Sequence, residues 1–369
     1  MTQDVIVIGL GAHGSAAAYH LAKRGLKVLG LEQFPRGHTL GSSGGLSRII
    51  RLSYYEHPDY VPMLRRAWDL WRELEREAGE TLLTQTGGLY LGRPDGELVS
   101  RALLSATTHG LAHEELDAAA LRARYPLFRI DDDWIGLHET QAGWLAPERC
   151  IETHLRMAER HGAQLEFGAR ARWSTDGDGV RVTTAAGTYS ADALVVTAGV
   201  WMPEMLPELA AHLWIERNVL FWFEPVRRTS EFDALPVWIL EDDDRFYYGF
   251  PRDPQYGFKV AGLRFGDRVD PNSVDREASP GDEARLRSFL ARRIPDADGE
   301  RRFAKVCMYT NSPDRQFVID RAAANVVFAS ACSGHGFKFA SAIGELLADM
   351  HQRRREPPRF LTAGRLAAV

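Results

Sequence analysis

The segment "DVIVIGLGAHGSAAAYHLAKRGLKVLGLE", residues 4–32, decides the fold class of this chain. The continuous apolar run at its start is typical of a buried parallel strand. Gly9, Gly11 and Gly14 then form a G-x-G-x-x-G turn before a stretch of helix-forming residues. The first glycine permits the tight turn, the second lets the backbone approach a pyrophosphate, and the third lets the helix pack against the strand. A second strand, "KVLGLE", follows, so the segment predicts a Rossmann-like unit that binds a dinucleotide.

Glu32 ends this second strand, 18 residues after Gly14. A carboxylate at this place is predicted to bond a ribose 2′-hydroxyl and to disfavour a 2′-phosphate. The motif does not separate FAD from NAD. His13, which lies inside the turn, is interpreted as a turn residue and receives no role.

Composition limits the other classes of function. The chain has 369 residues, a length typical of two domains, with 45% hydrophobic and 26% charged residues, as in ordinary soluble proteins. A net charge of −5 and the lack of a basic stripe argue against a nucleic-acid partner. No apolar stretch is long enough for a membrane span, and the start of the chain leads directly into a strand. The three cysteines are widely spaced and predict neither disulfides nor a metal site, so we expect a cytoplasmic protein.

The loop after the first unit is rich in glycine and serine and leads into "SRIIRLSYYE". Arg48 and Arg51 lie in this segment, separated by two isoleucines. The apolar neighbours predict that the segment is partly buried. Buried arginines need an anionic or aromatic partner, so both residues are candidates for a binding site.

A second strand, glycine turn and helix occur near the end of the chain, in "VVFASACSGHGFKFASAIGELLADM". Gly334 and Gly336 open a helix that is predicted to end near Met350. A helix N-terminus favours negative charge, which suits the anionic edge of a reduced flavin. Lys338 gains nothing from the helix dipole there, so we expect it to face a ligand. The apolar strand that ends at Gly199, in "ADALVVTAGVWM", also indicates the second half of a flavin-binding domain.

These motifs, together with "FYYGFP" and "CMYTNSPDRQFVID", resemble the monomeric sarcosine oxidase and N-methyltryptophan oxidase family over essentially the whole chain. That family consists of FAD-dependent amine oxidoreductases of the D-amino acid oxidase-like superfamily. Two motifs, "YTNSPD" and "GHGFKFAS", resemble the N-methyltryptophan oxidase branch more. The resemblance implies an α/β fold and a monomer. A Rossmann-like FAD-binding domain (residues 1–80, 145–205 and 310–369) would be interleaved with a substrate domain (81–144 and 206–309) on a mixed, largely antiparallel sheet.

The resemblance also implies roles for single residues. From the residues alone, Cys307 is more simply a small core residue, but in the family this cysteine carries FAD through a thioether. Arg51 and Lys338 match the pair that binds the substrate carboxylate, and Arg48 matches the arginine packed against the flavin ring. Lys259 matches the lysine near flavin N5 that activates oxygen. Tyr248 matches an active-site tyrosine.

The activity implied is oxidation of N-methyl (secondary) amino acids by dioxygen, giving the demethylated amino acid, formaldehyde and hydrogen peroxide. The chain departs from the family at Ser43 and Gly44, which replace a histidine pair, and at Leu263, which replaces another histidine. These departures leave open a dehydrogenase or oxidase of a cyclic imino acid such as proline or pipecolate. Two further alternatives are a nicotinamide-dependent dehydrogenase and a noncatalytic flavin-binding subunit of an amine oxidase complex.

Overall fold

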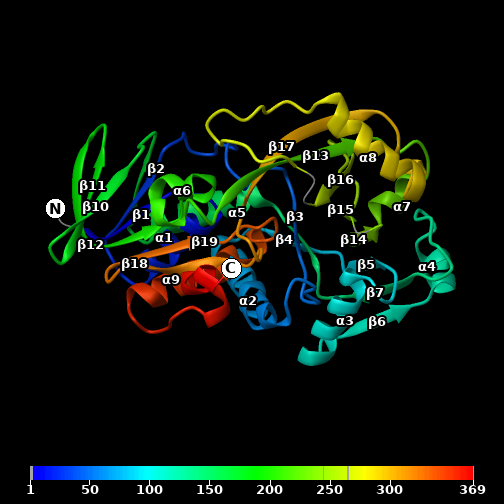
Figure 1. The fold of residues 1–369 in the computed structure, drawn as a ribbon, viewed down its shortest axis with the longest axis horizontal. Coiled ribbons are helices and arrows are strands. Elements are labelled where there is room, and N and C mark those ends of the chain that lie inside the picture. The colour runs from blue at the N-terminus through cyan, green and yellow to red at the C-terminus, as the bar shows by residue number, and fades with distance from the viewer. Residues whose placement is uncertain (1–2, 244, 264–265, 369) are drawn as a thin grey trace.

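The computed structural model describes residues 3–243, 245–263 and 266–368. They form two eight-stranded sheets and a three-stranded sheet (Figure 1). No helix in these three ranges is both long and apolar enough to cross a membrane.

The first sheet contains the predicted Rossmann-like unit. The continuous apolar run forms β1 (Gln3–Ile8), whose last four residues are buried, and the next strand, β2 (Val28–Glu32), is buried throughout. The pairs β1–β2, β1–β12, β2–β9 and β12–β19 are parallel, while β10, β11 and β18 add antiparallel pairs at its margins. The other strands are β9 (Gln164–Phe167), β10 (Arg172–Asp176), β11 (Gly179–Thr184), β12 (Gly187–Val196), β18 (Val318–Ala323) and β19 (Val326–Ser330).

Helices pack on this sheet through small and apolar residues. The helix after the glycine turn, α1 (Ala12–Lys23), contacts α5 (Pro147–Arg160) and α9 (Ala340–His351). The amphipathic helix α2 (Val61–Ala78) buries Leu64, Trp71 and Leu74 and also contacts α9. Trp71 further donates a hydrogen bond from Nε1 to the carbonyl of Lys338, at 2.9 Å, which ties the second glycine turn to the core.

The second sheet is mixed and largely antiparallel, as predicted. Of the pairings in its described part, only β14–β5 is parallel. Its strands are β5 (Gly88–Gly92), β6 (His113–Leu116), β7 (Ile135–Glu139), β13 (Trp214–Phe223), β14 (Val237–Asp242), β15 (Arg245–Gly249), β16 (Phe258–Leu263) and β17 (Arg301–Asn311). The helices that accompany it in sequence are α3 (Glu97–His109), α4 (Ala118–Arg124), α7 (Thr229–Asp233) and α8 (Pro280–Arg293).

Short elements connect the two large sheets. The third sheet joins β3 (Arg48–Ile50) and β4 (Leu83–Gln85) to β8 (Gly143–Leu145). The remaining helix is α6 (Met202–Met205), and the short 3-10 helices are η1 (Pro58–Tyr60), η2 (Gly199–Trp201), η3 (Pro207–Leu209), η4 (Pro295–Ala297), η5 (Phe337–Phe339), η6 (Arg359–Leu361) and η7 (Ala363–Ala368). The helix predicted to open at Gly334 and Gly336 begins instead as η5, which contains Lys338 and leads directly into α9.

The two large sheets take most of their strands from different parts of the chain. The first sheet takes its strands from residues 3–32, 164–196 and 318–330, and the second mainly from 88–139 and 214–263. The last strand of the second sheet, β17, crosses the predicted limit at residue 309. The domain limits themselves stay a prediction.

Two histidines are buried where α1 meets α5. His20 is 8% exposed and His154 is 1% exposed, and neither His20 Nε2 nor His154 Nδ1 has a hydrogen-bond partner in the described part of the chain. Burial, and secondarily the nearby Arg24, lowers the pKa of His20 to about 3. Burial also lowers the pKa of His154 well below its usual value. Both rings are therefore neutral in the folded protein near pH 7.

We predict that His20 makes the fold sensitive to acid. In the unfolded chain its pKa is about 6.5, so below that pH the unfolded state binds the proton and the folded state does not. The free energy of unfolding should fall as the pH drops from about 6.5 toward the folded pKa, by about 2 kcal/mol at pH 5 from this residue. Urea unfolding of a His20→Phe variant at pH 7.5 and pH 5 should show a smaller loss than the parent. The exposed His57, replaced by Gln, is the control, and an unchanged pH dependence in His20→Phe would refute the assignment.

Candidate active site

A cavity of about 240 Å³ lies between the two large sheets. Its lining comes from the residues that follow β1, β2, β12 and β19, and from side chains of β14, β15, β16 and β17. The carboxyl ends of parallel strands are the usual place for a ligand in such a sheet. Of the predicted site residues, the cavity is lined by Gly9, Gly11, Glu32, Arg48, Arg51, Gly199, Tyr248, Gly334, Gly336 and Lys338, whereas Gly14, Lys259 and Cys307 do not line it.

The first glycine turn has the close contacts that the motif requires. A Cβ on Gly9 would lie 2.5 Å from the Thr197 carbonyl oxygen, and one on Gly14 would lie 1.7 Å from the carbonyl oxygen of Gly9. By contrast, the nearest atom to a Cβ on Gly11 is Ser43 Oγ at 3.7 Å. No side chain caps the start of α1 at Gly11, so its first N–H groups are left for a ligand.

Glu32 lines the cavity but also holds the backbone. Its Oε2 accepts from the Leu10 N–H at 2.9 Å and its Oε1 accepts from the Phe34 N–H at 3.1 Å. A carboxylate has about four acceptor positions, so these two bonds leave room for a hydroxyl. The predicted bond to a ribose stays a prediction.

Arg51 is paired with a carboxylate that the sequence did not single out. Its Nη2 donates to both oxygens of Glu56, at 2.8 and 2.7 Å, and Nη1 donates to the Ser53 carbonyl at 3.3 Å. The guanidinium also lies 4.4 Å from the centre of the Tyr54 ring. Burial acts to raise the pKa of Glu56, but Arg51, with smaller contributions from His335 and Lys338, lowers it to about 2. The predicted anionic and aromatic partners of this arginine are thus both present.

Lys338 lies on the same tyrosine. Its Nζ is 5.2 Å from the centre of the Tyr54 ring and donates to the His335 carbonyl at 2.7 Å. Burial, followed by the charge of Arg51, lowers the pKa of Lys338 to about 7. The structure therefore brings these two cations, from distant parts of the sequence, to one wall of the cavity.

The glycine- and serine-rich loop, residues 41–47, is tied down by charged side chains. Arg48 donates to the carbonyls of Ser42 at 3.0 Å and Ser47 at 2.9 Å, and also to that of Gly44. On the other side, Glu148 Oε1 accepts from the N–H groups of Gly45 at 2.7 Å and Leu46 at 3.2 Å.

Lys259 is buried against this loop. Its Nζ donates to the carbonyls of Gly45 and Ser47, both at 2.7 Å, and to Ser47 Oγ at 3.1 Å. The aromatic ring of Phe250, which does line the cavity, is 4.4 Å from Nζ. Burial, followed by the charge of Arg48, lowers the pKa of this lysine well below its usual value. Three oxygen acceptors nevertheless match the three N–H donors of an ammonium.

Cys307 also contacts the loop. It is 3% exposed, its Sγ lies 3.5 Å from the Ser42 carbonyl oxygen, and Arg48 Nη2 is 3.6 Å from the same sulfur. Cys307 lies on β17, the strand at one end of the second sheet, and pairs there with Asn218 of β13. Arg48 therefore connects the cavity wall to the predicted flavin-bearing cysteine.

Two tyrosines and Leu263 are part of the wall contributed by the second sheet. The hydroxyls of Tyr248 and Tyr309 are 3.4 Å apart, and burial raises the pKa of both. Tyr309 was not predicted, although it lies two residues after Cys307 and therefore on the same face of the strand. Leu263 gives this wall an apolar side chain where the family has a histidine.

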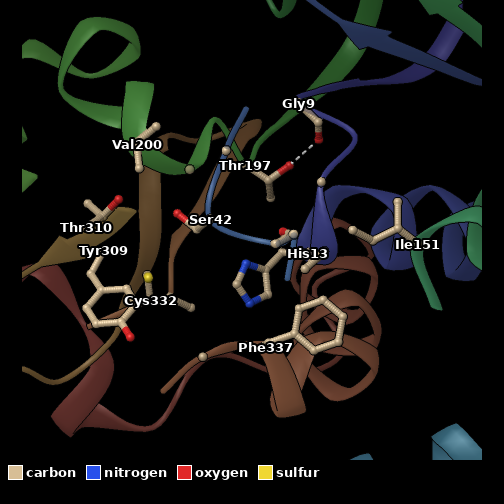
Figure 2. A pocket seen from close by; sticks show the side chains of 18 of the residues that line it. Gly9, His13, Ser42, Ile151, Thr197, Val200, Tyr309, Thr310, Cys332 and Phe337 are labelled. Carbon is tan, nitrogen blue, oxygen red and sulfur yellow. Dashed lines mark hydrogen bonds between the residues drawn. The ribbon is translucent and has the colours of Figure 1, made fainter. Parts of the chain in front are cut away.

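Several buried polar atoms around the cavity have no partner in the described ranges. They are His13 Nε2, Thr310 Oγ1 and Ser330 Oγ, and all three residues line the cavity. Figure 2 labels His13 and Thr310. Buried polar atoms are normally hydrogen-bonded, so such a group indicates a polar ligand. The described residues contain no cluster of three or more side chains suited to a metal.

Comparison with known proteins agrees with this geometry. A sequence profile of the family described as FAD dependent oxidoreductase (DAO) matches residues 4–350. The chain is 44% identical over 358 residues to monomeric sarcosine oxidase of Streptomyces avermitilis, covering 95% of this chain and 93% of the relative. It is 36% identical over 366 residues to N-methyl-L-tryptophan oxidase of Escherichia coli K12, covering 96% of each. Two motifs resemble the N-methyltryptophan oxidase branch more. Over the whole chain, however, the identity to this monomeric sarcosine oxidase is higher than the identity to this N-methyl-L-tryptophan oxidase.

Solved structures confirm the predicted fold class. NikD, described as an unusual amino acid oxidase essential for nikkomycin biosynthesis, matches with a TM-score of 0.84 at 24% identity, covering 97% of this chain and 96% of that one. L-proline dehydrogenase from P. horikoshii matches with a TM-score of 0.85 at 20% identity, covering 100% of this chain and 98% of that one. Similarity at these identities shows a shared fold and nothing about substrate.

Proposed function

The chain belongs to the DAO family of FAD-dependent oxidoreductases, and from this premise we propose that it oxidises N-methyl amino acids such as sarcosine or N-methyltryptophan. The products would be the demethylated amino acid, formaldehyde and hydrogen peroxide. The observation that carries the proposal is the pair of cations, Arg51 and Lys338, on the wall of the cavity that the glycine turns also line.

The residues around the cavity fit FAD. The open approach to Gly11 and the uncapped start of α1 suit its pyrophosphate, and Glu32 suits its ribose. The unpartnered polar atoms of the lining supply further hydrogen bonds. Bound FAD supplies the acceptor for the two electrons of amine oxidation, and the protein supplies binding, orientation and electrostatics.

Arg51 and Lys338 would fix the substrate carboxylate. Arg51 has five N–H donors, of which its bonds to Glu56 and Ser53 use three and a bond to Tyr90 uses another, and Lys338 uses one of its three donors on His335. The carboxylate can therefore bind without displacing Glu56. Charge-assisted bonds of this kind are strong, and they would hold the N-methyl group in one place between the walls of the cavity.

We predict that turnover requires the substrate carboxylate. Sarcosine or N-methyltryptophan should bleach the flavin anaerobically and release formaldehyde and peroxide in air, whereas dimethylamine should be a poor substrate. Arg51→Lys should weaken substrate binding by about 10- to 100-fold, because the planar guanidinium and its charged bonds are lost. Equal turnover of sarcosine and dimethylamine would contradict the carboxylate site. Turnover of proline or pipecolate without any N-methyl amino acid would support the cyclic imino acid alternative instead.

We further propose that Cys307 carries FAD covalently. The sulfur lies beside Arg48, which lines the cavity, and behind a loop that lines it too. The flavin of the parent protein should stay attached after acid precipitation, whereas Cys307→Ser should release it and keep the fold. Cys332, which lines the cavity, is the matched control, and Cys332→Ser should keep the flavin attached. Free release of flavin from the parent would sink the covalent assignment.

Lys259 is proposed to speed the reaction with dioxygen. Its charge would stabilise the anion that forms as dioxygen takes up an electron. In Lys259→Met we expect reoxidation to slow by about one to three orders of magnitude, while anaerobic reduction changes far less. Stopped-flow absorbance measures the two half-reactions separately, and Lys305→Met on β17, which β13 separates from β16, is the control. If Lys259 only anchors the loop, both half-reactions and flavin retention will change together.

A further inference from the structure

His13 has an unusual place in the first glycine turn. It is the second residue of α1, and it lines the cavity. Figure 2 draws its ring in the middle of the cavity, with Ser42, Cys332 and Phe337 around it in that view. Nothing in the proposed reaction uses this imidazole.

The hydrogen bonding of His13 defines what its free nitrogen can do. The backbone of Gly336 is hydrogen-bonded to the ring and raises its pKa, as a carbonyl that accepts from an imidazole N–H does. Since Nε2 is buried and has no partner within the described residues, that bond comes from Nδ1. Burial outweighs it and lowers the pKa of His13 to about 4, so the ring is neutral near pH 7. A neutral ring that donates from Nδ1 has a lone pair on Nε2. This nitrogen can therefore act only as a hydrogen-bond acceptor.

The position of His13 limits which group of FAD can donate a hydrogen bond to its Nε2. Its bond to Gly336 joins the first glycine turn to the second, so the ring lies between the proposed pyrophosphate site and the proposed site of the flavin ring. The phosphate oxygens of FAD only accept hydrogen bonds. The part of FAD that joins the pyrophosphate to the ring system is the ribityl chain, and its hydroxyls are donors.

We propose that His13 is a cofactor-binding residue that accepts a hydrogen bond at Nε2 from a ribityl hydroxyl of FAD. This assignment rests on the proposed binding of FAD in the cavity. It gives a role to a residue that the glycine motif alone leaves unassigned.

The test compares FAD with its 2′-, 3′- and 4′-deoxyribityl analogues. A Cys307→Ser background keeps binding reversible, so that flavin fluorescence gives the dissociation constants of the full-length protein. Loss of one neutral hydrogen bond should make His13→Phe bind FAD about 3- to 10-fold more weakly. With the analogue that lacks the correct hydroxyl, His13→Phe and its parent should bind equally. His13→Gln keeps an acceptor and should bind FAD within about twofold of the parent.

The imidazole also gives a direct signal. In ¹⁵N-histidine spectra, Nε2 of His13 should show the chemical shift of an unprotonated nitrogen and move on addition of FAD, but not on addition of the deoxy analogue that lacks the donor. If His13→Phe weakens the binding of FAD and of every deoxy analogue by the same factor, the assignment is wrong. It is also wrong if His13→Phe binds FAD as tightly as its parent. A parent protein that binds no FAD at all would overturn the proposed function, and with it this role.

Discussion

The close approach of three backbone segments at the first glycine turn is the constraint on which the rest of the structure depends. The carbonyl oxygens of Gly9 and Thr197 occupy the space that a Cβ on Gly14 or Gly9 would need. Thr197 Oγ1 also donates to the carbonyl of Gly9 at 2.8 Å (Figure 2). The carbonyl of Ile8 shares the same hydroxyl donor, at 3.1 Å. This contact fixes β1, α1 and β12 relative to one another. It therefore places the start of α1, the end of β12 and the cavity between them.

The two large sheets are then joined through buried cations. Arg48 lies on the short strand β3 and reaches Cys307 of the second sheet, while Lys259 of the second sheet reaches back to the loop before β3. Both donate mainly to backbone carbonyls of this loop, so removal of either cation would leave buried carbonyls without a partner. The geometry of the loop, and with it the wall of the cavity, therefore depends on these charges as well as on the packing of Leu46 against the apolar cluster around Leu220.

Features were predictable from the sequence where the residues that define them are close together in the chain. The glycine turn, Glu32 and the second turn at Gly336 are local, because a strand, a turn and a helix define their geometry within a few residues. The pairing of Arg51 with Glu56 is also local but has no periodic pattern, since both lie in an irregular segment. The bond between His13 and Gly336 joins opposite ends of the chain, and only the fold brings them together. The resemblance to known oxidases supplied residue roles that no local pattern contains, and those roles stay predictions.

Buried charge explains why this cavity is suited to anions. Four cations, Arg48, Arg51, Lys259 and Lys338, are largely buried in or beside it, whereas Glu56 is the carboxylate that pairs directly with one of them. Unpaired buried charges cost folding free energy, and the pKa of Lys338, lowered to about 7 by burial and by Arg51, reports part of that cost. A bound anion would relieve the repulsion and favour the charged form of Lys338. Carboxylate binding and the stability of the folded state are therefore coupled, because any ligand that binds only the folded protein stabilises it. If the proposed function holds, the same repulsion that weakens the fold is what would favour an anionic substrate.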